Sequence, residues 1–248
     1  MLENALSRRV LVTGALTAAA ITAAPAIAQG ASRRRSRVVE PAPTRNGKTT
    51  LGPDQALQLL KDGNAAFLRG ELLNPDTSPQ RRLELARYQA PFVAYVSCSD
   101  SRVPPELLFG RGLGELFIVR NAGNTVDTVA KGSIEFAVAV LGVPLIVVMG
   151  HEACGAVKAA LDVVAKNARF PGAIGTMIEP IIPAVLEARG AAGDPTEMAI
   201  RQNVRRTVRA LREDSDPLLM KPLADRKLKI VGAYYELGTG RVDFFDQP

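Results

Sequence analysis

The stretch FVAYVSCSDSRVPPE, residues 92–106, ends an apolar run in a cysteine and then places charged residues at alternate positions. An unbroken apolar run of this kind is typical of a strand covered on both faces, as in a parallel sheet. Cys98, Asp100 and Arg102 face the same way if the chain stays extended, because residues two apart share a side. The stretch therefore predicts a buried strand that carries a thiol and an ion pair to one edge of a sheet.

Two further apolar runs, at residues 115–123 and 144–151, have the same character. Segments with helical spacing follow them, at residues 125–142 and 152–168. Strands that alternate with helices imply a parallel sheet with right-handed crossovers. We therefore predict an α/β fold with a mainly parallel central sheet flanked by helices.

The flanks of this core complete a single predicted domain, residues 51–248. Residues 52–72 have Leu and Ala at helical spacing, and Ser78 is placed to cap a second short helix over 78–89. Near the C-terminus, 195–214 predicts an amphipathic helix and 228–246 two strands joined by a turn at Gly238 and Gly240. No internal repeat is present.

The first 28 residues have the pattern of a signal peptide. Arg8 and Arg9 precede a short, Ala-rich apolar segment that ends in a small-x-small motif at Ala28. The alternative, a membrane anchor, would need about 20 strongly apolar residues. The paired arginines resemble the twin-arginine export signal, whose route carries folded proteins. We expect cleavage after Ala28 and a periplasmic or secreted protein without stable membrane insertion.

The net charge of +6 is concentrated near the N-terminus. Residues 29–48 carry six basic side chains against one acidic, the signal segment adds one positive charge, and residues from 49 onward sum to zero. We predict that residues 29–50 form a basic, Pro-containing flexible tail. Because the folded part has no excess of basic residues, the sequence does not favour nucleic acid as a partner.

The second cysteine lies close to the only histidine of the chain. The segment GHEACGA places His151 and Cys154 three residues apart, where the third apolar run passes into a helix. Cys98 ends the first run, so two sulfurs and one nitrogen meet at strand ends, where sites form in such sheets. Zinc accepts these ligands tetrahedrally, and three protein ligands with an open fourth position is the catalytic arrangement.

Two cysteines in an exported chain would by default form a disulfide. Metal binding is the competing interpretation, because a thiolate held by zinc is protected from oxidation. Asp100 then has two possible roles. It either binds the metal as a fourth ligand, or pairs with Arg102 and accepts a hydrogen bond from the metal-bound hydroxide.

The two-part pattern CSDSR and GHEACG, about fifty residues apart, resembles the β-class carbonic anhydrases. The resemblance extends over most of residues 91–242 and implies their fold, with an N-terminal helical arm from residue 53 that contacts a partner. It also implies zinc-dependent, reversible hydration of carbon dioxide to bicarbonate and a proton, with zinc-bound hydroxide as nucleophile. The implied zinc ligands are Cys98, His151 and Cys154, one ion per subunit, with Asp100 and Arg102 as the catalytic dyad.

The resemblance also implies residues that bind substrate. Gln89 matches a glutamine that reaches into the site of the partner subunit, so a homodimer or a tetramer built from dimers is expected. Phe117 and Gly155 match positions that line the pocket. Ala122 and Phe136 stand where some relatives have a larger aliphatic residue and a tyrosine.

Three other functions compete with this interpretation. A zinc deaminase shares the ligand types but needs H-x-E and C-x-x-C motifs, which the chain lacks. A non-catalytic zinc-binding module would keep Asp100 on the metal. A hydrolase of a related small molecule, such as carbon disulfide, would share every ligand.

Overall fold

The computed structural model describes residues 36–248, all of which belong to one compact unit. Its centre is a five-stranded sheet in the order β6-β5-β7-β8-β9. The strands are β5 (Val93–Cys98), β6 (Leu116–Asn121), β7 (Leu145–His151), β8 (Lys229–Tyr235) and β9 (Val242–Asp246). The first four run parallel and β9 pairs antiparallel with β8. The predicted fold class, a mainly parallel α/β sheet, is confirmed.

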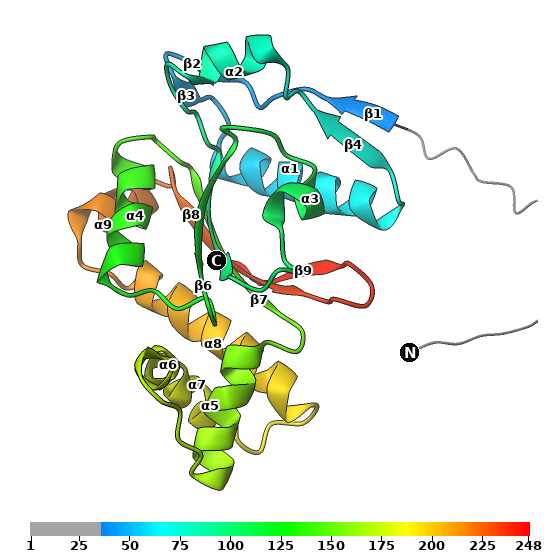
Figure 1. Ribbon diagram of the computed structural model, residues 1–248. Helices are drawn as coiled ribbons and strands as arrows, with labels where there is room; N and C mark the ends of the chain where they lie inside the picture. Colours follow the sequence, from blue (N-terminus) through cyan, green and yellow to red (C-terminus); the bar gives the residue numbers. More distant parts are fainter. Residues whose placement is uncertain (1–35) are drawn as a thin grey trace, which may run out of the picture. The chain divides into compact units, whose positions relative to one another are not determined.

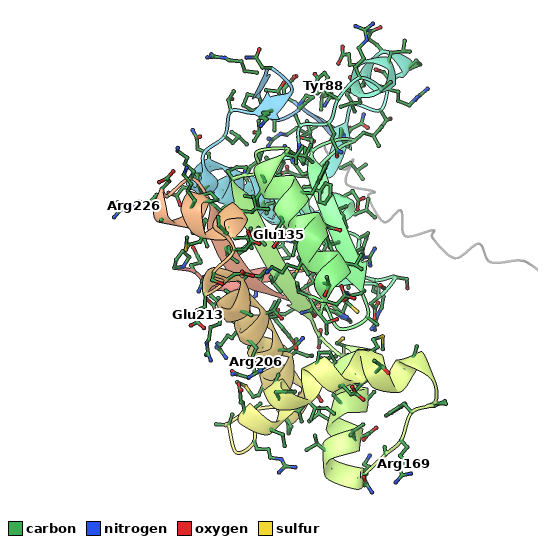
Figure 2. All side chains as sticks on the ribbon, turned by 90° about the vertical axis from the view of Figure 1, so that its left-hand side faces the viewer. Tyr88, Glu135, Arg169, Arg206, Glu213 and Arg226 are labelled. Atoms are coloured by element: carbon green, nitrogen blue, oxygen red, sulfur yellow. The ribbon has the colours of Figure 1, made fainter. Side chains whose placement is uncertain are left out.

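Helices cover both faces of this sheet (Figure 1). One face packs against α1 (Pro53–Leu68) and α3 (Pro105–Phe109), and receives Tyr95. The opposite face packs against α4 (Thr128–Ala139), α8 (Pro195–Arg212) and α9 (Pro217–Ala224), and receives Val96. Figure 2 looks onto this second face, with Glu135 on α4 and Arg206 on α8. Burial on both faces explains why β5 and β7 have uninterrupted apolar sequences.

A third apolar cluster lies at the carboxyl ends of the parallel strands. It joins α5 (Gly155–Lys166), the 3₁₀ turn Glu179–Ile181 and α7 (Ile182–Glu187) to the first turns of α8, with α6 (Ala173–Ile178) adjacent (Figure 1). Cys98 and Cys154 are buried members of this cluster. Helices therefore cover the carboxyl edge of the sheet, and both cysteines are buried between this edge and the helices.

The prediction of a flexible tail is wrong for residues 36–50, because these residues contain paired strands. This segment contains β1 (Ser36–Val39), which pairs in parallel with β4 (Leu72–Pro75), and a hairpin of β2 (Thr44–Arg45) and β3 (Lys48–Thr49). Val39 and Ala42 are buried, and the Ala42 N–H donates to Glu115. Strands of two to four residues have no readable period, so the basic composition suggested a tail. The predicted signal peptide, and the tail up to residue 35, lie outside the described residues.

The expected N-terminal helical arm divides into two parts with different environments. Helix α1 packs on the sheet of its own subunit, where Leu60 is fully buried. Helix α2 (Pro79–Leu85) begins after Ser78, whose side chain accepts from the Arg81 N–H as predicted, and it has no buried residue. Among residues 36–248, no helix combines the length and apolar character needed to cross a membrane.

Candidate metal centre

Three side chains converge at the carboxyl edge of the sheet. Cys98 is the last residue of β5, His151 is the last residue of β7, and Cys154 caps the N-terminus of α5. One ligand atom from each lies within 4.8 Å of the others, and all three residues are buried. The two Sγ atoms are 3.9 Å apart and both cysteines are free. The structure thus holds a cluster of thiols where a disulfide was the default expectation.

The imidazole of His151 is oriented for ligation. Its Nδ1 lies 2.9 Å from the carbonyl oxygen of Glu152, so Nδ1 donates to that oxygen and Nε2 is the ring nitrogen left to bind a ligand. Nε2 is fully buried and has no hydrogen-bond partner among the described residues. A buried polar atom without a partner is costly, which indicates that a ligand is meant to satisfy it.

The donor set fits zinc. Bonds of about 2.3 Å from a tetrahedral zinc ion place two sulfurs about 3.8 Å apart, close to the observed separation. Two sulfurs and one imidazole nitrogen are also the ligand types that zinc prefers. The structure therefore supports the predicted ligand set of Cys98, His151 and Cys154.

The environment shifts the pKa values of the two thiols in opposite directions. The pKa of Cys98 is lowered, chiefly because the Cys154 thiol donates to it, with help from the Gly123 N–H. The pKa of Cys154 is raised, because it keeps the proton of this hydrogen bond and is buried. The first N–H groups of α5, at Ala156 and Val157, act in the opposite direction on Cys154.

Asp100 and Arg102 form a two-pronged ion pair beside the cluster. Arg102 donates from Nε to Oδ1 at 2.9 Å and from Nη2 to Oδ2 at 2.7 Å, and its backbone N–H also donates to Oδ1. These bonds lower the pKa of Asp100 well below its usual range. Oδ2 lies 3.9 Å from His151 Nε2. Of the two roles considered for Asp100, the structure agrees with pairing to Arg102. Its carboxylate is not part of the cluster of Cys98, His151 and Cys154.

Backbone contacts fix this edge of the sheet. The guanidinium of Arg120, on β6, donates to the carbonyl oxygens of Cys98 at 2.8 Å and Asp100 at 2.6 Å. The Val103 N–H donates to the same Asp100 carbonyl, which closes a tight turn. Glu152 accepts from the backbone of Leu237 and Gly238 and so ties the His151 loop to the β8–β9 turn.

Of the expected pocket residues, Ala122 and Gly155 lie near the cluster, whereas Phe117 pairs with Ala94, four residues before Cys98 along β5. The rings of Phe117 on β6 and Phe136 on α4 contact each other at a tilt of 33°, with centroids 6.3 Å apart, and Phe136 is exposed. Ala122 follows β6 and is half-buried. Gly155 follows Cys154 directly, is exposed, and has open space where a side chain would begin. Their roles in substrate binding stay predictions.

Gln89 lies elsewhere in the subunit. It is exposed, in the loop between α2 and β5, and precedes the first residue of β5. Cys98 ends that strand, about 16 Å from its first residue at 3.3 Å per residue. Figure 2 shows its neighbour Tyr88 at one end of the described unit, opposite Arg169, which follows α5. The structure does not bring Gln89 to the cluster of its own subunit.

Sequence reasoning missed Gly123, which contacts the site, and Asn203, which anchors Gly123. Gly123 donates its N–H to Cys98 Sγ at 3.4 Å, and Asn203 on α8 donates to the Gly123 carbonyl at 2.9 Å. A signal for Asn203 was present, because it is a polar residue on the apolar face of an amphipathic helix. Nothing in the sequence connects it to a loop eighty positions away.

Comparison with known proteins agrees with this geometry. The profile of a family described as carbonic anhydrase matches residues 93–242. A carbonic anhydrase of Mycolicibacterium smegmatis is 41% identical over 191 residues, which cover 77% of this chain and 92% of the relative. Carbonic anhydrase 2 of Mycobacterium tuberculosis is 39% identical over 189 residues, with 76% and 91% covered.

Solved structures show the same fold. A structure from work on two tetrameric β-carbonic anhydrases of the ascomycete Sordaria macrospora superposes with a TM-score of 0.61 and 28% identity. The superposed residues cover 77% of this chain and 97% of the Sordaria macrospora chain. The β-carbonic anhydrase CafA of Aspergillus fumigatus superposes with a TM-score of 0.59 and 27% identity, covering 78% and 90%.

Proposed function

The chain belongs to the β class of the carbonic anhydrases, and from this premise we propose that it hydrates carbon dioxide reversibly to bicarbonate and a proton, using one zinc ion per subunit. The observation that carries the proposal is the buried cluster of two thiols and an unpartnered imidazole nitrogen beside an ion-paired aspartate. A stopped-flow assay of carbon dioxide hydration on metal-loaded protein tests it. Failure to accelerate hydration at pH 8 to 9 would contradict it.

The three protein ligands would hold the metal and set the charge around it. When bound by Cys98, His151 and Cys154, zinc lowers the pKa of a coordinated water and so supplies hydroxide near neutral pH. Two thiolates bring more negative charge to the centre than imidazoles would. We therefore expect activity to rise toward alkaline pH.

Asp100 orients the nucleophile. Its carboxylate stays ionised because Arg102 holds both oxygens, so it accepts a hydrogen bond from the attacking water and never donates one. Accepting that bond leaves an oxygen lone pair directed toward the carbon of the substrate. Arg102 also prevents Asp100 from occupying the fourth position of the metal.

The substrate is apolar and small, and two small residues leave room for it beside the ligands. Ala122 follows the carboxyl end of β6, and Gly155 has open space next to Cys154. Ala122, smaller than the aliphatic residue of some relatives, widens the proposed pocket.

No second histidine is available to transfer the released proton, because His151 is the only histidine in the chain. We expect buffer to accept the proton directly, so that rates rise with buffer concentration.

The pairing of Asp100 favours an enzyme over a non-catalytic zinc module. A module would hold the metal with four protein ligands, whereas Asp100 has both oxygens engaged by Arg102. Hydrolysis of carbon disulfide on the same ligands stays the alternative substrate. Parallel assays with the two substrates separate these activities.

We propose that the protein self-associates, and the position of Gln89 supports this if Gln89 binds substrate. Since Gln89 precedes β5 while the metal ligands lie beyond its far end, it serves a site only if that site belongs to a second copy. A hollow of about 520 Å³ beside the edge strand β6 offers a surface for this copy. It contains the exposed side chains of Leu72 (49%), Leu107 (68%) and Leu113 (47%). Contiguous exposed apolar groups of this kind mark protein interfaces.

We also propose that the protein is exported in folded form, on the strength of Arg8, Arg9 and the small-x-small motif at Ala28. Export with the metal in place would keep Cys98 and Cys154 reduced in an oxidising compartment. Fractionation of cells that express the wild type and a variant with Arg8→Lys and Arg9→Lys tests this. Retention of the wild type in the cytoplasm would contradict it.

A further inference from the structure

Asn203 is an unusual residue at its position. The inner face of α8 is apolar, formed by Ala199, Ile200, Val204, Val208 and Leu211, yet Asn203 lies among them with 3% of its surface exposed. A buried amide costs free energy unless it is hydrogen-bonded. Its Nδ2 donates to the carbonyl oxygen of Gly123 at 2.9 Å.

Gly123 is held tightly from the other side. Its φ is +84°, and a Cβ there would lie 2.5 Å from Ile181 Cδ1 and 3.1 Å from Ala156 Cβ. Only glycine adopts this conformation in this space without strain. The side chain of Asn121 closes the same loop by accepting from the Thr125 N–H and donating to the Thr125 carbonyl.

The N–H of this confined glycine points at the metal site, where it donates to Cys98 Sγ at 3.4 Å. A chain of contacts therefore runs from α8 through the Gly123 carbonyl to the ligand sulfur. Because the donor to the sulfur is a backbone group, its direction depends on how the two peptides of Gly123 are anchored.

We propose that Asn203 is a positioning residue that holds the Gly123 N–H on the Cys98 thiolate and thereby sets how firmly this sulfur binds the metal. The proposal rests on the metal centre of the proposed function. Without the Asn203 amide, the Gly123 carbonyl loses its buried donor, the loop shifts, and the thiolate loses a stabilising N–H. Outer groups that orient metal ligands typically contribute about 10- to 100-fold to affinity.

The test measures metal binding rather than turnover. Zinc affinity of the full chain is determined by competition with a chelator, and the thiolate-to-metal charge-transfer band is recorded after substitution with cobalt. Asn203→Leu has a similar volume and no donor, so we expect zinc affinity to fall about tenfold or more and the band to shift. Val208→Ala is the matched control. It removes fully buried methyl groups from the same helix, so it lowers thermal stability without changing affinity or band position.

Two further variants keep the test decisive. Asn203→Asp preserves the shape but presents a carboxylate in place of the amide donor, and it replaces Asn203→Leu if that variant does not fold. Asn203→Ser retains a shorter donor and is expected to lie between wild type and Asn203→Leu. Wild-type affinity and an unshifted band in the donor-free variant would overturn the proposal. A wild type that binds zinc but does not hydrate carbon dioxide would overturn only the proposed function.

Discussion

The carboxylate of Asp100 is held by the guanidinium of Arg102 through two parallel hydrogen bonds, from Nε to Oδ1 at 2.9 Å and from Nη2 to Oδ2 at 2.7 Å. Oδ2 also lies 3.9 Å from the unpartnered Nε2 of His151. Asp100 is thus close to the cluster, but both of its carboxylate oxygens accept hydrogen bonds from Arg102. This arrangement keeps Asp100 out of the cluster of Cys98, His151 and Cys154, as the proposed function requires.

The first prediction concerns this ion pair. Arg102→Ala releases Asp100 toward the metal, so we expect kcat/KM for hydration to fall about 100-fold or more, as for loss of a positioned catalytic group. Cobalt spectra report the change of fourth ligand independently of activity. Arg241→Ala, which breaks the exposed pair with Glu236, is the control and is expected to retain wild-type rates. Unchanged rates and spectra in Arg102→Ala would contradict the role of the pair.

The second prediction tests whether Gln89 acts across an interface. Gln89→Ala and Asp100→Ala are each expected to be nearly inactive as pure proteins. When the two are unfolded and refolded together, half of the dimers combine them, and each mixed dimer has one site with both residues intact. Activity should therefore return to about one quarter of wild type for a twofold dimer. If refolded mixtures show no more activity than the separate variants, Gln89 does not serve a partner site.

The third prediction concerns removal of the metal. The apo protein keeps a buried, unpartnered His151 Nε2 and two thiols in contact. Zinc binds the folded state, so its removal is expected to lower the free energy of unfolding by about 4 kcal/mol when free zinc had been 1,000 times Kd. Thermal denaturation with and without a chelator, followed by addition of zinc, measures this. Equal melting temperatures would indicate that the cluster binds no metal.

The fourth prediction follows from an ion pair outside the site. Lys131 on α4 donates to Asp214, just after α8, and lowers the pKa of this carboxyl. A folded-state pKa below the unfolded one contributes stability above the unfolded value, about 3.9, and this contribution is lost as pH falls through the folded value. Stability measured from pH 6 to pH 3 should therefore decline less steeply in Asp214→Asn. The same slope in both proteins would contradict the assignment.

The cluster of Cys98, His151 and Cys154 could be predicted because each residue lies at the end of a strand or the start of a helix that the sequence pattern indicates. Cys98 and His151 end apolar strands that parallel pairing brings side by side, and Cys154 begins the next helix. The sequence pattern does not predict whether Asp100 binds the metal or pairs with Arg102, because the metal site and Arg102 both lie on the same side of an extended chain. That choice depends on the turn closed by Val103 and on the Arg120 contacts.

The remaining differences have similar physical causes. β1 and β4 pair across more than thirty residues, and neither has enough length to show alternation. The hydrogen bond between Asn203 and Gly123 joins a helix to a loop that the sequence separates by eighty positions. Local periodicity predicts elements and their ends, whereas contacts between distant segments require the assembled fold.

The most direct test of the account is stopped-flow hydration of carbon dioxide beside zinc analysis of the wild type and Cys98→Ser. The account predicts about one zinc per subunit and rapid hydration at pH 8 to 9 in the wild type, with both lost in Cys98→Ser. Stoichiometric zinc without any acceleration of hydration in the wild type, or full activity in Cys98→Ser without zinc, would contradict it.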